Sequence, residues 1–139
     1  MAMADLAKHG ADDPVPLSAV ADRQLISLAY LEQLFLRLRR AGLVVSERGR
    51  TGGYRLARSA DAISVAEIMA AVDEGTRMTR CAGESGMTCL PGQRCLTHGL
   101  WDALGAHIGA FLSHVTLRDV LEGVPKEARR FPAVELGAE

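Results

Sequence analysis

The residues most able to do chemistry are three cysteines and one histidine in the second half of the chain. They are Cys81, Cys89, Cys95 and His98, and they include every cysteine of the protein. Thiolates and imidazoles are ligands for soft and borderline transition metals. Glycine, proline and small polar residues separate them, as is typical of a loop. The pattern therefore predicts a metal centre held by one irregular segment.

The spacing of these ligands indicates the kind of centre. The three gaps hold seven, five and two residues, whereas structural zinc sites usually present paired Cys-x2-Cys turns. Wide gaps suit a larger object, such as an iron–sulfur cluster. An imidazole ligand can be protonated, so the bond between the histidine and the cluster would be sensitive to pH and redox state. Such sensitivity is useful in a sensor. A zinc-stabilised loop and a metal-free loop stay open as alternatives at this point.

The residues around the cysteines do not favour catalysis. The segment contains no Gly-rich oxyanion turn, no orienting carboxylate and no general base besides His98,. The chain also has no phosphate-binding loop and no paired catalytic carboxylates,. We therefore expect a protein that is not an enzyme.

The overall composition indicates one globular domain in a reducing compartment. The chain has 139 residues, of which 48% are hydrophobic, enough for a core. It has no apolar run of about 18 residues, so no membrane contact is expected. Its first residues lack the features of a signal peptide, and an odd number of cysteines argues against a disulfide framework. The expected location is the cytoplasm.

The charge is strongly uneven although the net charge is only −1. Eight arginines lie between Arg23 and Arg58, opposed only by Glu32 and Glu47, so this segment carries +6. Such a block on an otherwise acidic chain favours a polyanionic partner. A solvated arginine face is the alternative explanation.

Two helices joined by a tight link are predicted around that block, at Leu17–Gln24 and at Leu28–Ala41. Ser27 is a good N-cap for the second helix, whose apolar residues have the three-and-four spacing of one buried face. The pair predicts a helix-turn-helix, with an ordinary helical hairpin as the alternative. The exposed side chains able to meet base edges are Ser27, Ala29, Tyr30, Glu32 and Gln33,.

A β hairpin is predicted directly after these helices. Its strands are Leu43–Val45 and Tyr54–Ala57, joined by a Gly/Arg-rich loop at Ser46–Gly53,. A hairpin in this position is a wing, and its basic tip can reach phosphates or a minor groove. The tip contains Arg48, Gly49 and Arg50. Together with the arginine block, the wing predicts binding to double-stranded DNA, and it argues against a cluster carrier that does not bind DNA.

A long helix is predicted at Leu96–Val115, starting at the last ligand of the metal centre. Its apolar residues repeat at intervals of three and four, as in a helix that packs against a partner helix. They are Trp101, Leu104, Ile108, Phe111 and Val115. We therefore expect a homodimer, whose two-fold symmetry would suit a palindromic operator. Packing of this helix on its own domain is the alternative.

The expected fold is mainly α with a small β-hairpin wing, a winged helix-turn-helix followed by a long dimerisation helix. The DNA-binding domain is expected over residues 1–75 and the cluster-binding loop over 76–98. The dimerisation helix and a short helix are expected over 96–123, and a flexible tail over 124–139. Capping boxes at Ser64-Val-Ala-Glu67 and Thr116-Leu-Arg-Asp119 predict two further helix starts,.

Three motifs closely resemble the IscR family of iron–sulfur cluster-binding winged-helix regulators. They are Ile26-Ser-Leu-Ala-Tyr-Leu-Glu-Gln-Leu-Phe35, Arg48-Gly49 with Gly52-Gly-Tyr54, and Cys95-Leu-Thr-His98 with Leu100-Trp101. The resemblance covers about residues 1–123. It implies a homodimeric repressor of iron–sulfur cluster assembly genes, with the assembly machinery as cluster donor. Cluster loss would lift this repression, and the cluster-free form would bind a second class of site.

The resemblance also implies roles for individual residues. A [2Fe–2S] cluster would be held by Cys81, Cys89, Cys95 and His98. DNA contacts would come from Ser27, Tyr30, Glu32 and Gln33 on the recognition helix, and from Arg48 and Gly49 on the wing. Glu32 would discriminate between classes of site, because a carboxylate disfavours nearby phosphate and accepts from a cytosine amino group.

The chain departs from the family pattern in two places. The first cysteine gap is two residues longer than in the best-known members, so a [4Fe–4S] or nitric-oxide-sensing regulator is the alternative. The family's chain also begins earlier, with a short basic and aromatic segment that helps to grip DNA. We therefore expect weaker DNA binding than in a version extended upstream; equal affinities in a salt-matched gel shift would contradict this.

Overall fold

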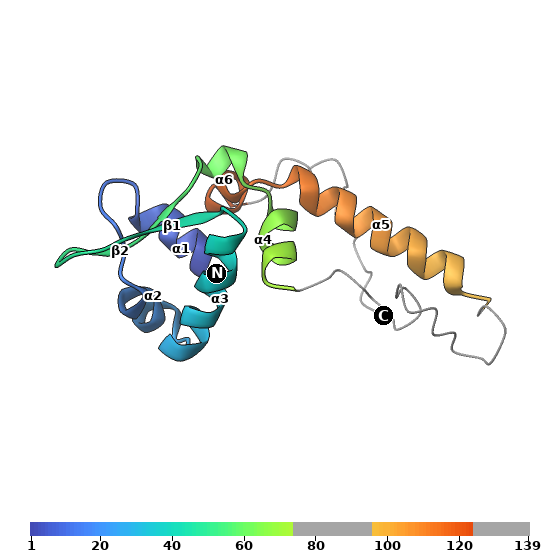
Figure 1. Cartoon of the computed structure of the whole chain (residues 1–139). Helices are drawn as coiled ribbons and strands as arrows, with labels where there is room; N and C mark the ends of the chain where they lie inside the picture. The colour runs from blue at the N-terminus through green and yellow to red at the C-terminus, as the bar shows by residue number, and fades with distance from the viewer. Residues whose placement is uncertain (74–95, 124–139) are drawn as a thin grey trace, which may run out of the picture.

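The computed structural model describes residues 1–73 and 96–123. The first part contains α1 (Ala2–His9), α2 (Leu17–Gln24), α3 (Leu28–Arg40), β1 (Val44–Glu47), β2 (Gly53–Leu56), the 3₁₀ turn η1 (Ala60–Ala62) and α4 (Val65–Ala71). The second part contains α5 (His98–His114) and α6 (Leu117–Leu121). In Figure 1, α5 projects away from a body made of the other elements. The expectation of a mainly helical winged helix-turn-helix is confirmed.

Local capping explains where α3 begins. The Ser27 hydroxyl accepts a hydrogen bond from the Tyr30 backbone N–H at 3.1 Å, as expected for an N-cap,. Beyond the cap, Leu31, Phe35 and Leu38 are buried on one side of the helix. The neighbouring positions on the other side therefore stay in solvent.

The hairpin pairs two strands in antiparallel register, from Val44 opposite Leu56 to Glu47 opposite Gly53. The strands lie closer to the tip than predicted, because Ser46 and Glu47 join the ladder and the loop shrinks to residues 48–52. Polar residues are tolerated there because both are exposed,.

A short extended segment before α2 supports the base of the hairpin. Val15 exchanges two backbone hydrogen bonds with Tyr54, at 2.9 and 2.8 Å. A Cβ on Gly53 would lie only 2.4 Å from the carbonyl carbon of Val15, so this close approach needs glycine. The wing is therefore fixed to the start of the helix-turn-helix.

The core lies where α1, α2, α3, the hairpin and α6 meet. The Phe35 and Tyr54 rings make an edge-to-face contact with centroids 5.0 Å apart,. The fully buried large side chains are Leu6, Val20, Leu31, Phe35, Leu43, Val44 and Ile63. Six of these lie on α1, α2, α3 or at the start of the hairpin, and Ile63 follows η1, so one core holds the helix-turn-helix and the wing together.

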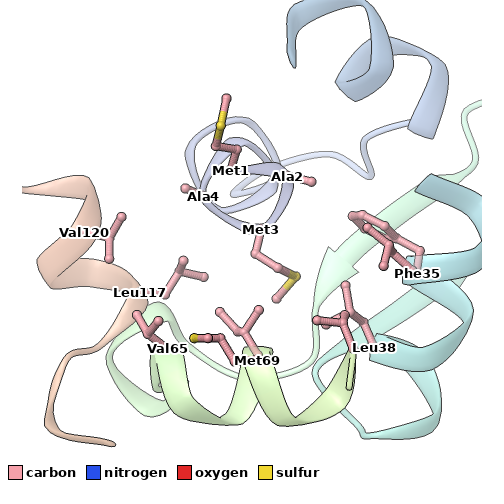
Figure 2. Close-up of a pocket in the computed structure, with 13 residues that line it drawn as sticks. Met1, Ala2, Met3, Ala4, Phe35, Leu38, Val65, Met69, Leu117 and Val120 are labelled. Atoms are coloured by element: carbon pink, nitrogen blue, oxygen red, sulfur yellow. The ribbon is translucent and has the colours of Figure 1, made fainter. Parts of the chain in front are cut away.

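A cavity of about 300 Å³ opens between α1, α3, α4 and α6. Figure 2 shows Met3, Leu38, Met69 and Leu117 around it. The described residues that line the cavity are all apolar. None of the lining side chains carries an ionisable or nucleophilic group, so the cavity offers an apolar surface and no side chain for chemistry.

The chain returns to the body after α5. The Val65 N–H donates to the Val115 carbonyl at 2.9 Å, and the Leu117 N–H donates to the Ile63 carbonyl at 2.8 Å. Val115 and Leu117 are both buried. The sequence-based division grouped the short helix with α5, but in the structure α6 packs on α1 and η1.

Both capping boxes predicted from the sequence are present. The Ser64 hydroxyl accepts from the Glu67 N–H while the Glu67 carboxylate accepts from the Ser64 N–H. Together with a hydrogen bond from Arg58, this lowers the pKa of Glu67 to about 2,. Thr116 and Asp119 form the second box in the same way.

Candidate nucleic-acid interface and metal centre

The recognition surface of α3 is open to solvent. Ser27, Tyr30, Glu32 and Gln33 are all exposed, with 49% of Tyr30 accessible. Within the described ranges no ion pair engages Glu32, so its carboxylate is free to accept hydrogen bonds. The first turns of α3 therefore present hydroxyl, phenol, carboxylate and amide groups, which can pair with base edges in a major groove.

The wing tip is also exposed, and its backbone requires glycine. Arg48, Gly49 and Arg50 all lie in solvent, and Gly49 has φ of 126°, a conformation that other residues rarely adopt. A Cβ on Gly52 would lie 2.6 Å from the Glu47 carbonyl oxygen. These glycines let the turn reverse tightly, so the two arginines stand at its end.

Ion pairs divide the arginine block into two groups. Three members contact carboxylates: Arg23 pairs with Asp5, Arg55 with Glu47 and Arg58 with Glu67. In the described parts of the chain, the other members contact no carboxylate: Arg37, Arg39, Arg40, Arg48 and Arg50. The unneutralised charge therefore lies on α3 and the wing tip, where a polyanion would bind.

A buried carboxylate braces α1 against α2. Asp5 is 6% exposed and accepts hydrogen bonds from Arg23 Nη2 at 2.6 Å and from Gln24 Nε2 at 2.9 Å. The Arg23 hydrogen bonds hold the pKa of the Asp5 carboxyl below its usual value, although burial acts in the opposite direction,. The brace sets the position of the first helix of the helix-turn-helix.

A second long-range contact joins α3 to the end of α4. Arg37 Nη1 donates a hydrogen bond to the Val72 carbonyl at 3.0 Å. Val72 is the C-cap of α4, and residues 74–95, which contain the cysteines, follow directly after Asp73. The recognition helix is therefore bonded to the backbone that leads into the cysteine segment.

The other end of the cysteine segment leads into α5. His98 is the first residue of α5, and its Nε2 lies 3.0 Å from an Asp102 carboxylate oxygen, one turn along. Cys81, Cys89 and Cys95 lie outside the described residues. Within those residues no three His, Cys, Asp or Glu side chains gather as a metal site. His98 is the one predicted ligand whose position is known.

The donor set fits a metal cluster in its chemistry. Three thiols and one imidazole provide four ligands of the type that iron–sulfur clusters accept. A carboxylate beside the far nitrogen of a ligating imidazole is the usual way of orienting the ring, and Asp102 occupies that position relative to His98.

Helix α5 exposes apolar side chains along its length. It has 17 residues, and none of them is buried. Leu100 is 63% exposed, while the predicted interface residues Trp101, Leu104, Ile108 and Phe111 are partly exposed. Val115 differs: it follows the end of the helix and is 2% exposed. Unlike the other four predicted interface residues, Val115 is therefore covered within its own chain.

Three features of the site were missed by sequence reasoning. The Asp5–Arg23 brace and the Arg37–Val72 contact join residues far apart in the chain, so no spacing rule signals them. Leu25 lies between α2 and α3 with φ of 54° and is 93% exposed. For Leu25 the sequence did offer a signal, because the predicted helix ends at Gln24. The residue after a helix end often adopts a left-handed conformation, whether or not it is glycine.

Comparisons with known proteins agree with this geometry. The Rrf2 family, described as an iron-dependent transcriptional regulator, matches residues 1–123. The HTH-type transcriptional regulator IscR of Yersinia enterocolitica is 52% identical over 120 residues, which cover 86% of this chain and 72% of that protein. IscR of Photobacterium profundum is also 52% identical, over 86% of this chain and 69% of its own.

Solved structures show the same fold. T. potens IscR superposes with a TM-score of 0.69 at 38% identity, covering 92% of this chain and 82% of that one. CymR, the global cysteine regulator of B. subtilis, superposes with a TM-score of 0.71 at 31% identity, covering 86% and 87%. No helix in the described parts is long and apolar enough to cross a membrane.

The IscR relatives are named as transcriptional regulators, which confirms the expectation of a DNA-binding protein that is not an enzyme. The resemblance inferred from the three motifs is confirmed as well. Given the match over residues 1–123 and the IscR relatives, the chain belongs to the Rrf2 family of transcriptional regulators and is of the IscR helix-turn-helix type.

Proposed function

We propose that this protein is a homodimeric repressor whose DNA recognition depends on an iron–sulfur cluster, and that it controls genes for cluster assembly. The proposed ligands are Cys81, Cys89, Cys95 and His98, with [2Fe–2S] as the cluster and the assembly machinery as its donor. One observation carries the proposal. In the sequence, the cysteine segment lies between α4 and α5. The C-cap of α4 is hydrogen-bonded to Arg37 of α3, the proposed recognition helix, and α5, the proposed dimer helix, begins at His98.

The chain's own residues would connect the cluster to DNA through these two ends. When bound, an iron–sulfur cluster would supply a centre that oxygen, iron limitation or cluster demand can remove. Asp102 would hold Nε2 of His98, which leaves Nδ1 as the ring nitrogen for the cluster,. Arg37 would transmit the position of the α4 C-cap to α3. The cluster state would thereby shift the population of α3 positions that fit an operator.

The proposed dimer rests on α5. An apolar helix of 17 residues without one buried side chain would leave a large hydrophobic surface in water,. A second copy of α5 would cover Trp101, Leu104, Ile108 and Phe111 on both chains. Two recognition helices related by a two-fold axis would then meet two half-sites of a palindromic operator.

The proposed DNA contacts are Ser27, Tyr30, Glu32 and Gln33 from α3, and Arg48, Gly49 and Arg50 from the wing. Their exposure and the unpaired charge at the wing tip support this assignment. Arginines at the tip would meet phosphates or the minor groove. Glu32 would reject sites that place a phosphate beside it, and accept those with a cytosine amino group.

Anaerobic purification tests the proposal. The expected product is coloured, with visible absorption of an iron–sulfur cluster and with two iron and two sulfide ions per chain. Four of each per chain would identify the [4Fe–4S] alternative. A colourless protein with stoichiometric zinc would overturn the proposed sensing role. A protein purified without metal would overturn it as well if its affinity for the operator were the same before and after reconstitution with iron and sulfide.

A further inference from the structure

Leu25, in the turn between α2 and α3, has a conformation and an exposure that folding does not explain. Its φ of 54° and ψ of 42° lie in the left-handed region, which carries a steric cost for every residue with a Cβ. Its side chain is 93% exposed, so burial of apolar surface does not compensate for that cost. Glycine would adopt this conformation without strain.

The position of Leu25 places it beside the surface that reads DNA. Its N–H closes α2 by donating to the Ala21 carbonyl, and Ile26 donates to the same carbonyl at 3.1 Å. Ser27, two residues later, is the N-cap of the recognition helix. Leu28, the first residue of that helix, is also exposed, at 42%. Two exposed apolar side chains, Leu25 and Leu28, therefore lie on either side of the Ser27 cap in the sequence.

We propose that Leu25 is a specificity-determining residue that contacts DNA in the major groove and favours thymine through its C5-methyl group. The methyl is the one apolar group that a base pair presents in that groove, and aliphatic side chains are its natural partners. The contact would remove Leu25 from water on binding, which the folded protein alone does not do. This role rests on the DNA binding proposed above and deepens it.

Two variants separate a DNA contact from a structural role. Leu25→Gly removes the side chain and relieves the backbone. Leu25→Asn keeps a side chain that tolerates the left-handed conformation but makes it polar. We expect both to fold, with a melting temperature equal to or above that of the unmodified protein. Leu121→Ala on α6, which is 39% exposed in the unmodified chain, is the matched control and should leave DNA affinity unchanged.

The probe is a duplex selected by the unmodified protein from a random-sequence pool, in which each thymine is then replaced singly by deoxyuridine. At one position per half-site, loss of the methyl group should weaken binding by the unmodified protein by about fourfold. The same replacement should have no effect on Leu25→Gly or Leu25→Asn, and both variants should bind the thymine duplex about as weakly as the unmodified protein binds the deoxyuridine duplex.

The outcomes distinguish this role from DNA binding itself. If the unmodified protein selects no sequence, DNA recognition as a whole fails. The thymine contact is wrong if the unmodified protein selects a sequence but both variants lose the same affinity on deoxyuridine replacement. It is also wrong if both variants bind the thymine duplex as tightly as the unmodified protein does. A fall in melting temperature for Leu25→Gly would also overturn the role, because it would show that the side chain serves folding.

Discussion

Arg37 on the recognition helix donates a hydrogen bond of 3.0 Å to the backbone carbonyl of Val72, at the end of α4. The two residues are 35 positions apart in the chain. This contact joins α3, the proposed DNA-reading helix, to the backbone immediately before the cysteine segment. A single hydrogen bond contributes about 0.5–1.5 kcal/mol, which overlaps the lower end of the roughly 1–3 kcal/mol typical of a coupling free energy between two sites.

Replacing Arg37 by Ala should reduce the effect of the cluster on DNA affinity. The ratio of operator affinities with and without cluster should fall by up to about tenfold, because the helix no longer responds to the α4 C-cap. Gel shifts with both forms under anaerobic conditions measure this ratio. Arg39→Ala removes the same charge from the same helix, where Arg39 contacts Ser46 at 3.4 Å. It should weaken both forms equally; a ratio changed to the same extent would refute coupling through Arg37.

Replacing Asp5 by Asn should lower the free energy of unfolding by about 2 kcal/mol, because Arg23 loses a charged and partly buried partner. Asp5 has a lowered pKa in the folded protein. Its contribution is therefore complete above the unfolded-state pKa of about 3.9 and disappears as the pH falls through the lower folded value. The difference between the two proteins in urea titrations should be constant from about pH 5 to 8 and shrink below about pH 4. Asp12→Asn, at an exposed turn, should show no such difference.

Replacing His98 by Ala should shorten the lifetime of the proposed cluster in air without unfolding the protein, since one of the four proposed ligands is lost. Asp102→Ala should shorten the cluster lifetime less, by about 10-fold or less, because Asp102 contacts Nε2 of His98 and its loss would leave the imidazole ring free to rotate,. The decay of visible absorption measures both. His107→Ala, further along α5, should decay as the unmodified protein does; equal decay for all four proteins would exclude His98 as a ligand.

Replacing Arg48 or Arg50 by Ala should weaken DNA binding for all sequences alike. Each phosphate contact that is lost should reduce the slope of log affinity against log salt concentration by about 0.9. Fluorescence anisotropy over a range of salt concentrations gives the slope. Arg58→Ala is the matched control, because Arg58 already pairs with Glu67 at 2.8 Å. A slope reduced as much by Arg58→Ala would mean that total charge matters and the wing tip does not.

Placing a carboxylate on the apolar face of α5 should prevent formation of the proposed dimer. Leu104→Glu and Ile108→Glu would each bury a charge without a partner, which costs several kcal/mol. Sedimentation equilibrium should then give the mass of one chain. Ala106→Glu adds the same charge at an exposed position of the helix and should leave the dimer intact. Monomers for the unmodified protein would remove the basis for the proposed interface.

The sequence alone was sufficient wherever structure depends on neighbours along the chain. The caps at Ser27 and Ser64 and the apolar spacing of α3 predicted helices that the structure contains within about one to two residues,. The hairpin was predicted less accurately. Ser46 and Glu47 join a strand because they pair with Tyr54 and Gly53 on the opposite strand, although their own β propensity is low,. The three-motif resemblance likewise identified the family, since it depends only on residue identity.

Only the tertiary structure decided which distant residues meet. Folding brings Asp5 to Arg23 and Arg37 to Val72, and it returns α6 to the body so that Leu117 is buried. It also places Leu25, strained and exposed, beside the recognition helix. The sequence determined the type of fold and the family, because these follow from local pattern and residue identity; the ligand set stays a prediction from the same pattern. The contact between α3 and the backbone before the cysteine segment depends on packing between elements, which no local pattern encodes,.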